Sequence, residues 1–409
     1  MPRAGETPRL KRGLGLGLLT LYGLGTTIGA GIYVLIGSMA GVAGVYAPVS
    51  FLVAALLVVF TGLSFAELGS RHPHAAGEAV YVRVAFGRED LALAVGLVTA
   101  FAGIVSAAAI INGATGYVQE LVPLPRAAVL LAIAGGLALV AAWGIVESSL
   151  MIALITLLET AGLIAVILAG ALGTPDLFAR LPELVPPPSV EAWGAILASA
   201  LLAFFAFVGF EAMVNLAEEV KDVARTLPRA ILLTLVITSL LYGAIACVAV
   251  LAVDPAELAA SSAPLALVFE RASGLSSAPF SAVAAIATVN GALVMMIMAT
   301  RVVYGLAQQG NLPAPLGRVN ARTRTPLVAT ALVAVVVAFI ALALPLATLA
   351  RASSALMLAI FMLMNLTLLA LKRRGPPPAG ALDLPRWIPA SGLLASGGFL
   401  AQQLWTRVF

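Results

Sequence analysis

The stretch GLGTTIGAGIYVLIG, residues 23–37, holds four glycines within nine residues of an otherwise apolar run. Glycine in a helix interior costs about 0.5 to 1 kcal/mol relative to alanine, so this density predicts a helix that is locally unwound. A second stretch, FFAFVGFEAMVNLAEE at 204–219, places Gly209 close to the acid Glu211. It predicts a second, weaker break, and the expected fold follows from these two stretches together.

The composition predicts that the chain lies in a lipid bilayer. Of its 409 residues, 61% are hydrophobic and only 10% are charged, against about 25% charged in soluble globular domains. Several apolar runs are long enough to cross about 30 Å of hydrocarbon as helices, at 1.5 Å per residue. The single Cys247 excludes a disulfide framework and a thiolate metal cluster. We therefore expect an all-α membrane protein that needs no cofactor and no metal.

Eleven apolar runs are expected to span the bilayer, separated by segments rich in proline and charge. They cover about 14–43, 47–69, 91–119, 126–143, 149–173, 192–217, 229–253, 279–309, 326–344, 346–371 and 386–406. The expected order is a cytoplasmic tail (1–13), a five-helix repeat (14–173), an external loop (174–191), a second five-helix repeat (192–371), and a cytoplasmic loop with the eleventh helix (372–409).

The basic residues predict the orientation of these spans. When the 23 lysines and arginines are sorted by alternate loops, 18 fall on one side and 5 on the other. Under the positive-inside rule, the richer side is cytoplasmic. We expect a cytoplasmic N-terminus, an external C-terminus and a place in the cell (inner) membrane, and no role in nucleic-acid binding.

The two glycine-interrupted runs open the two five-helix blocks, at matching positions. Interrupted helices in corresponding places of two halves indicate an inverted-repeat transporter with its site at the midplane, although close helix packing also explains small residues in a membrane helix. Unwound backbone persists in lipid only where a ligand, ion or water completes it. Free N–H groups near Ile28 to Gly31 suit a carboxylate and free carbonyls suit an ammonium, so the expected ligand is a zwitterion.

Four motifs resemble those of the amino acid, polyamine and organocation transporter superfamily, in particular bacterial amino acid permeases and cationic amino acid transporter relatives. They are GTTIGAGIYVLIG in the first run, FAELGSRHPHAAGEAVYVRVAFG at 65–87, FFAFVGFEAMVNLAEEVKDVARTLPRAI at 204–231 and TRVVYGLAQQGNLPAPLGRVNARTRTPLVAT at 300–330. The resemblance covers nearly the whole chain. It implies a 5+5 inverted-repeat transporter fold with discontinuous helices 1 and 6 and one extra C-terminal helix.

The resemblance also implies where an amino acid would bind. Its carboxylate would be held by N–H groups near Ala30 and Gly31, and its ammonium by carbonyls of Thr27, Phe205, Ala206 and Val208. The first, third, sixth and eighth spans would line the side-chain pocket, and Phe205 or Phe207 would act as a gate, unless these rings are ordinary apolar bulk. The expected substrate-binding set is Thr27, Ile28, Gly29, Ala30, Gly31, Asn112, Phe205, Ala206, Phe207 and Val208.

Charged residues inside the predicted spans are functional candidates, because each costs about 2.5 to 3.5 kcal/mol to insert. Glu159 lies mid-span, where similar permeases often carry a lysine, and is our candidate for carrying a coupling proton. A sodium ion, or a purely structural partner, suits it as well. Glu211 is expected to cap the half-helix after the break and to act in gating. Glu67 is expected to pair with Arg71 at i+4.

Other polar groups have a structural and a functional interpretation. Asn112 and Asn290 suit interhelical hydrogen bonds, and Asn112 could instead face the substrate. A charged cluster is expected to form an inner-face network or to be solvated loop charge; its members are Glu218, Glu219, Lys221, Asp222, Arg225, Arg322 and Arg324.

The function expected is secondary active transport of amino acids by alternating access, as proton-coupled symport of neutral amino acids. Alternatives are amino acid exchange, sodium coupling and, less favoured, transport of polyamines or cationic amino acids. An ion channel is a rival of another class. We do not expect an enzyme. The two histidines of the chain, His72 and His74, lie in a basic loop without a catalytic motif.

Overall fold

The computed structural model describes residues 14–72, 77–143, 149–320, 323 and 325–408. The predicted tail 1–13, and the side chains of Glu218 and Glu219 with residues Arg322 and Arg324, lie outside this described part. The α-helices are α1 (Leu16–Ala43), α2 (Ala47–Arg71), α3 (Gly77–Phe86), α4 (Glu89–Gln119), α5 (Arg126–Trp143), α6 (Ser149–Gly173), α7 (Val190–Phe207), α8 (Val223–Ala252), α9 (Pro255–Ala260), α10 (Pro264–Ser273), α11 (Ala278–Gln308), α12 (Leu327–Ala343), α13 (Leu346–Arg374) and α14 (Trp387–Val408).

Short 3₁₀ helices complete the set, at η1 (Gly44–Tyr46), η2 (Leu181–Leu184), η3 (Phe210–Glu219) and η4 (Ala314–Gly317). Within the described ranges, the β-type contact is an isolated parallel bridge between Leu14 and Val220. The expected all-α class is confirmed.

Long apolar helices dominate the fold. Seven stretches of the described chain are long and apolar enough to cross a membrane, one of which, 16–71, contains both α1 and α2. Two shorter apolar helices, Arg126–Ala142 and Leu327–Ala343, correspond to α5 and α12. Helix α14 stands where the eleventh run was predicted, but its glycine, serine and glutamine residues make it less apolar and it is not among these stretches.

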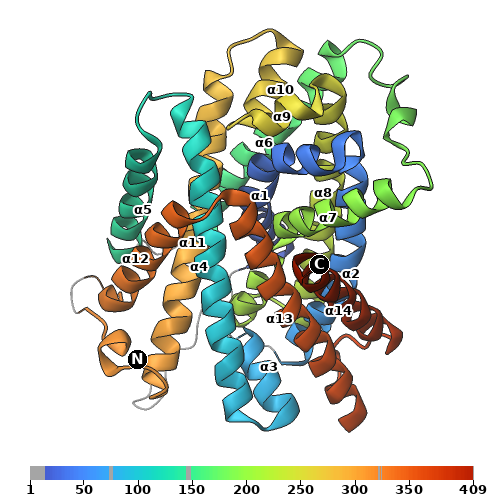
Figure 1. The fold of residues 1–409 in the computed structure, drawn as a ribbon. Helices are drawn as coiled ribbons and strands as arrows, with labels where there is room; N and C mark the ends of the chain where they lie inside the picture. The colour runs from blue at the N-terminus through green and yellow to red at the C-terminus, as the bar shows by residue number, and fades with distance from the viewer. Residues whose placement is uncertain (1–13, 73–76, 144–148, 321–322, 324, 409) are drawn as a thin grey trace.

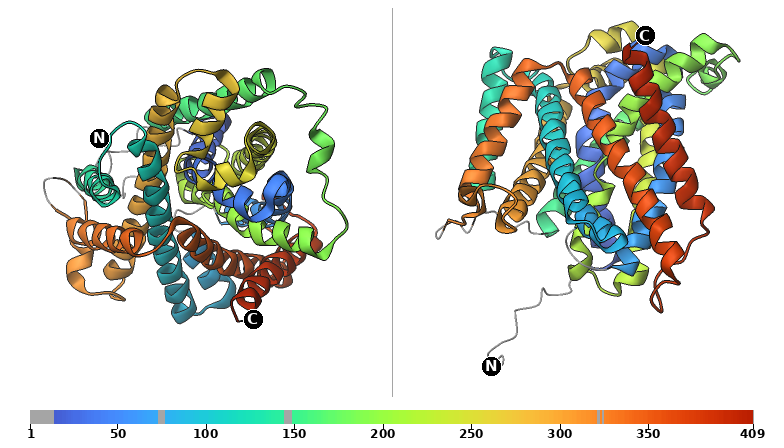
Figure 2. Two further views of the ribbon diagram at one scale, coloured as in Figure 1. Left: turned by 45° about the horizontal axis from the view of Figure 1, so that its top comes forward. Right: turned by 60° about the horizontal axis from the view of Figure 1, so that its bottom comes forward.

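The helices pack as pairs drawn from distant parts of the chain. Helix α4 packs most extensively against α11, α2 against α8, and α1 against α7, while α5 contacts α12 at one edge of the bundle. Figure 2 (right) shows α5 and α12 at this edge and α14 at the opposite one, where α14 packs on α13 and α2. The short helix α3 lies at one end of the bundle, and α9 and α10 lie at the other (Figure 1).

The predicted break in the first run is wrong, because α1 is a continuous helix from Leu16 to Ala43. Its glycines serve close packing, the alternative explanation. A Cβ on Gly31 would lie 2.0 Å from the Cα of Ala206, and one on Gly23 would lie 2.4 Å from the Sδ of Met213. Small residues let membrane helices approach closely, and this tight interhelical packing offsets the conformational cost of glycine.

The predicted break in the sixth run is confirmed. Helix α7 ends at Phe207, Val208 is extended with ψ of 131°, and Gly209 has φ of 131°, which only glycine adopts readily. The chain then continues as the 3₁₀ helix η3. A Cβ on Gly209 would lie 2.3 Å from the carbonyl oxygen of Thr26 in α1. The break therefore sits directly against the middle of α1.

Candidate functional site

The interruption between α7 and η3 is held by the Glu211 side chain and by one backbone hydrogen bond. The backbone N–H of Gly209 donates to Oε2 of Glu211 at 2.8 Å, and Glu211 is only 3% exposed. The N–H of Val208 donates to the carbonyl of Phe205 at 3.1 Å. A carboxylate that accepts from backbone N–H groups at a helix start stabilises that start. Glu211 thus lies at the break, where capping was predicted, and its role in gating stays a prediction.

Tyr242 of α8 joins the two helices that flank the break. Its hydroxyl lies 2.9 Å from the carbonyl oxygens of both Thr27 in α1 and Ala206 in α7. The ring is buried and packs edge-on against Phe207, with ring centroids 5.2 Å apart. The carbonyls of Thr27 and Ala206 are two of those predicted to hold a substrate ammonium. Tyr242 was not among the predicted site residues, although a tyrosine with a polar tip in the apolar run 229–253 was a visible signal.

Glu159 is buried in α6 without a hydrogen-bond partner for either carboxyl oxygen among the described residues. Its backbone carbonyl accepts a hydrogen bond from the hydroxyl of Tyr33 at 2.8 Å. The Asn290 amide on α11 lies nearby, but Glu159 and Asn290 do not form a hydrogen bond of ordinary geometry. An acid in this setting is costly unless it is protonated or meets a cation. Among the described residues, no partner that neutralises this carboxyl is seen.

Asn112 serves the contact between helices. Its amide nitrogen donates to the carbonyl of Ala341 at 2.9 Å and to that of Leu344 at 3.2 Å, and its side-chain oxygen accepts from Arg126. These bonds tie α4 to the start of α5 and the end of α12. The structure thus supports the interhelical interpretation of Asn112 and gives no support for a substrate contact.

The remaining predicted site residues lie together but are closely packed. Thr27, Ile28, Phe205, Ala206 and Phe207 are each no more than 1% exposed. Val208 is also buried, and for Gly29 and Ala30 only the backbone is described. Because α1 stays helical, the N–H groups of residues 28–31 belong to its helix ladder. The expected free donors for a carboxylate are therefore absent from this described stretch, which corrects the prediction.

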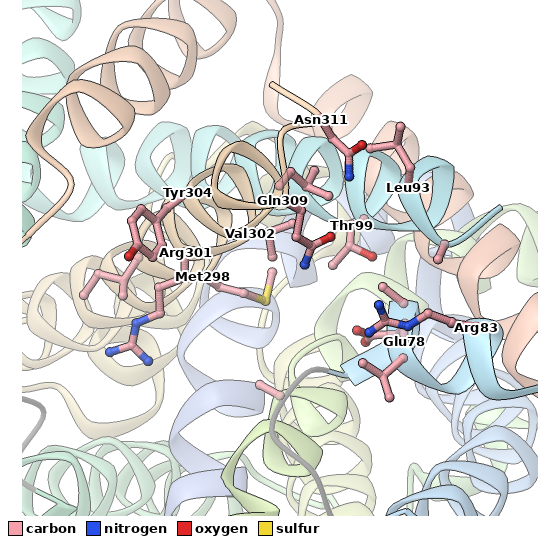
Figure 3. Close-up of a pocket in the computed structure, with 18 of the residues that line it drawn as sticks. Glu78, Arg83, Leu93, Thr99, Met298, Arg301, Val302, Tyr304, Gln309 and Asn311 are labelled. Carbon is pink, nitrogen blue, oxygen red and sulfur yellow. The ribbon is translucent and has the colours of Figure 1, made fainter. Parts of the chain in front are cut away.

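A cavity of about 690 Å³ lies below this region, at the end of the bundle that carries α3. It opens between α3, α4 and α11 and reaches Tyr22 of α1 and Ala212 of η3. Its wall includes Glu78, Arg83, Glu89, Thr99, Val294, Ile297, Met298 and Arg301. Figure 3 shows Arg301 on one side, Glu78 and Arg83 on the other, and Met298 and Thr99 between them. Among the predicted substrate-binding residues with described side chains, none lines this cavity.

The chain is similar to known transport proteins over most of its length. The family model described as "Amino acid permease" matches residues 16–404, nearly the whole chain. The chain belongs to this amino acid permease family. It is 28% identical over 410 residues to the "Branched-chain amino acid permease BcaP" of Bacillus subtilis (strain 168), covering 94% of this chain and 84% of that protein. It is also 33% identical over 338 residues to the "Uncharacterized transporter Rv1999c" of Mycobacterium tuberculosis (strain ATCC 25618 / H37Rv), covering 81% of this chain and 74% of that one.

A plant relative extends the comparison. The permease is 29% identical over 335 residues to the "Cationic amino acid transporter 9, chloroplastic" of Arabidopsis thaliana, which covers 76% of this chain and 58% of that protein. The family and the apolar helices make the permease a multi-pass integral membrane protein and a transporter, not an enzyme. The family predicted from the sequence motifs is confirmed.

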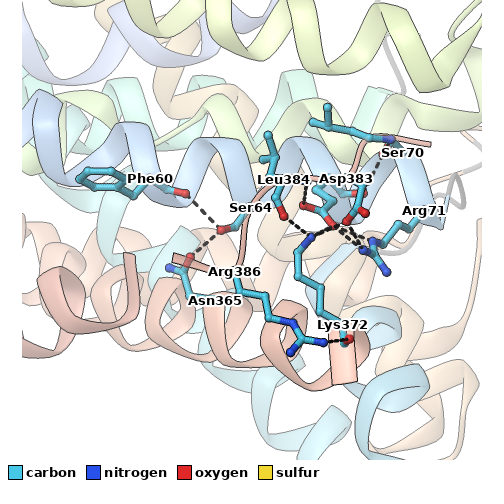
Figure 4. A network of polar contacts seen from close by, with 11 residues as sticks. Phe60, Ser64, Ser70, Arg71, Asn365, Lys372, Asp383, Leu384 and Arg386 are labelled. Carbon is cyan, nitrogen blue, oxygen red and sulfur yellow. Dashed lines mark hydrogen bonds and ion pairs between the residues drawn. The ribbon is translucent and has the colours of Figure 1, made fainter. Parts of the chain in front are cut away.

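The permease carries a buried ion network at the same end as the cavity (Figure 4). Nε of Arg71 donates to Glu67 at 2.8 Å, as predicted for this i+4 pair. Two further partners were not predicted: Nζ of Lys372 lies 2.6 Å from Glu67 and 2.7 Å from Asp383. The second oxygen of Glu67 accepts from the N–H of Leu384 at 3.0 Å. The network therefore ties the loop before α14 to α2 and α13.

The other predicted inner-face cluster is seen only in part. Arg225 approaches Asp222 at 4.0 Å, and both side chains are largely exposed. An exposed pair at this distance contributes little to stability, so the described part of the cluster fits solvated loop charge.

Proposed function

We propose that the permease moves neutral amino acids across the membrane by alternating access, in symport with protons. The observation that carries this proposal is the break at Val208–Gly209, held against α1 and bridged by Tyr242. Broken helices in transporters place free backbone groups at the substrate site. In this structure the carbonyls of Thr27 and Ala206 both face the hydroxyl of Tyr242. When that hydroxyl moves away, the two carbonyls can accept hydrogen bonds from a substrate ammonium.

The arrangement of the helices supports a 5+5 inverted repeat in this proposal. Counted as spans, the strongest pairs join the first to the sixth (α1, α7), the second to the seventh (α2, α8), and the third to the eighth (α4, α11). The fourth and ninth spans (α5, α12) also pack together. A two-fold axis between two five-helix halves would produce such pairing. This pairing supports the proposed halves 14–173 and 192–371, followed by the segment 372–409.

The cavity and the charge pattern support an orientation. The cavity opens at the end that carries α3, Arg83 and Arg301, on the side where most lysines and arginines were placed. By the positive-inside rule this side is cytoplasmic. We infer that the structure represents an inward-facing state in the cell membrane, with the end of α14 on the external side.

Glu159 supports proton coupling. It is the buried acid of α6, and its carboxyl oxygens lack partners in the described structure. A carboxyl in this environment can be neutral by carrying a proton, whereas its charged form would need a cation such as sodium. The named function of the Bacillus relative favours a branched aliphatic amino acid as substrate.

The test is uptake of labelled leucine, alanine, arginine and putrescine into proteoliposomes that contain the purified chain. We expect saturable uptake and counterflow of leucine, stimulated by an inward proton gradient without sodium. Uptake that requires sodium and ignores the gradient contradicts the coupling. Uptake only against a preloaded amino acid indicates an exchanger, and currents that do not saturate indicate a channel.

A further inference from the structure

The cavity between α3, α4 and α11 has the composition of a binding site and not only of a water-filled exit. Its size lies within the range of about 300–1,000 Å³ that is common for small-ligand sites. Apolar side chains form one part of the wall, including Val294, Ile297 and Met298 of α11. Charged groups of both signs face it from opposite sides (Figure 3). This combination suits a small ligand that is both zwitterionic and aliphatic.

Thr99 of α4 lines the cavity and carries a buried hydroxyl that has no partner in the described structure. Threonines elsewhere in these helices donate back to the carbonyl four residues earlier, as Thr115, Thr288 and Thr300 do at 2.8 Å. Thr99 is only 7% exposed, and its hydroxyl has no hydrogen-bond partner among the described residues. A buried hydroxyl without a partner costs free energy. The hydroxyl oxygen itself has almost no accessible surface, so a ligand in the cavity would reach it after a rotation of the Thr99 side chain.

Arg301 is the free cation of the cavity. It is exposed, and it forms no ion pair with another residue of the described structure. Arg83, by contrast, lies 3.7 Å from Glu89. A guanidinium without a carboxylate partner is suited to receive the carboxylate of a ligand.

Glu78 of α3 faces the cavity from the other side. It is 7% exposed, and burial raises the pKa of its carboxyl above the usual range. Within the cavity, a ligand ammonium would supply the charge that favours the ionised form. Arg301 and Glu78 thus supply one charged group of each sign to the wall of the cavity.

We propose that this cavity is a second, cytoplasmic subsite that holds a neutral aliphatic amino acid between the membrane site and the cytoplasm. Arg301 binds the carboxylate, Glu78 and Thr99 face the ammonium, and the apolar residues of α11 contact the side chain. The proposal rests on the transport function proposed above. It predicts that affinity for substrate differs between the two sides of the membrane, because only a substrate arriving from the cytoplasm meets the subsite first.

The test compares labelled leucine transport in right-side-out and inside-out membrane vesicles. For Arg301→Gln, we expect the KM measured from the cytoplasmic side to rise about tenfold, with the external KM within about twofold of wild type. Thr99→Val should shift the same KM in the same direction, and Thr99→Ser should restore it. Arg318→Gln, which removes an exposed arginine outside the cavity, is the matched control. Melting temperatures of the purified variants check that each is folded.

The outcomes separate this proposal from the proposed function. If wild-type vesicles transport leucine and Arg301→Gln moves neither KM, or moves both equally, the subsite is overturned. If wild-type vesicles transport no leucine, the proposed function fails. Saturable leucine binding to the purified protein that Arg301→Gln removes would then still support the subsite, and absence of such binding would overturn it.

Discussion

Glu159 is the residue on which proton coupling depends. Its carboxyl is buried in α6, near Asn290, yet it makes no hydrogen bond in the described structure. A coupling group that is neutral in one step of transport and charged in another must lie close enough to the substrate site for its charge to affect binding. The backbone carbonyl of Glu159 accepts from Tyr33 of α1, the helix against which the break packs.

Glu159→Gln removes the proton-bearing group and keeps the size of the side chain. We expect uptake of labelled leucine to lose its response to an imposed proton gradient, while counterflow continues at a rate within severalfold of wild type. Proteoliposome uptake with and without the gradient measures this effect. Glu191→Gln changes an exposed acid at the start of α7 and is the control. A variant that still follows the gradient would refute the assignment.

Gly209 is required by the geometry of the break. Its φ of 131° is strained for any other residue, and a Cβ would collide with the carbonyl oxygen of Thr26 at 2.3 Å. We expect Gly209→Ala to cost about 1–3 kcal/mol and to abolish most transport, because the break would have to move away from α1. Thermal unfolding and uptake check both effects. Gly194→Ala, in the open part of α7, should leave both unchanged.

At the scale of elements, α9 and α10 close the end of the bundle opposite the cavity. Backbone carbonyls of the segment 258–272 pack directly against glycines of three different helices. A Cβ would lie 2.5 Å from the oxygen of Leu258 at Gly37 in α1, 2.0 Å from that of Ser262 at Gly116 in α4, and 1.7 Å from that of Ala272 at Gly173 in α6. A backbone oxygen cannot move aside as a flexible side chain can, so the segment reaches this position only because those residues are glycines.

Gly116→Ala should prevent the segment 258–262 from docking on α4. We expect a fall in leucine transport of about tenfold or more with the helical content unchanged, because the strain of about 1–3 kcal/mol falls on one docked state. Circular dichroism and uptake measure the two properties. Gly136→Ala in α5, where a Cβ meets nothing within 4 Å, is the matched control. Equal transport by the two variants would contradict this role.

The shorter helices were not predicted from the sequence. The segments 254–264 and 70–90 separate predicted spans, yet they contain α9 and α3. Both helices are short and are stabilised by packing against longer ones. Apolar periodicity over so few residues carries little information, so their existence could not be predicted.

At the scale of the whole molecule, the buried ion network connects the eleventh span to the rest of the bundle. Glu67, Arg71 and Lys372 are each at most 5% exposed at the side chain, while Asp383 is 60% exposed. The Lys372 ammonium beside Asp383 lowers the pKa of that carboxyl below its ordinary value. Its ionised form therefore stabilises the docked loop.

Asp383→Asn removes this contribution, and the sign of its pH dependence follows from the lowered pKa. The stabilisation is fully present above the unfolded Asp pKa of about 3.9 and is lost as the pH falls through the lower folded value. We expect wild type to melt at a higher temperature than Asp383→Asn at pH 7, and the gap to narrow below about pH 4. Melting in detergent across this range measures it. Asp176→Asn, an exposed acid after α6, is the control, and a gap that ignores pH would contradict the role.

The sequence alone was enough to predict that the chain lies in a lipid bilayer, that its fold is all-α, which family it belongs to, and where the long helices lie. This is because hydrophobicity and helix length are local properties. Glycine also weakens a helix locally, and at Gly209 the helix does end. The ion pair between Glu67 and Arg71 could also be predicted, because side chains at i and i+4 are neighbours on any helix.

Which glycines unwind a helix, and which let helices touch, depended on the packing of the folded chain. The glycines of α1 looked like a break, but Ala206 and Met213 pack against two of them and α1 continues unbroken. Packing of the folded chain also brought Tyr242 to the break and brought Lys372 and Asp383 to the ion network of Glu67. Their partners lie up to several hundred residues away in the chain, and the free energy of a contact between such residues depends on a distance that the order of residues does not state.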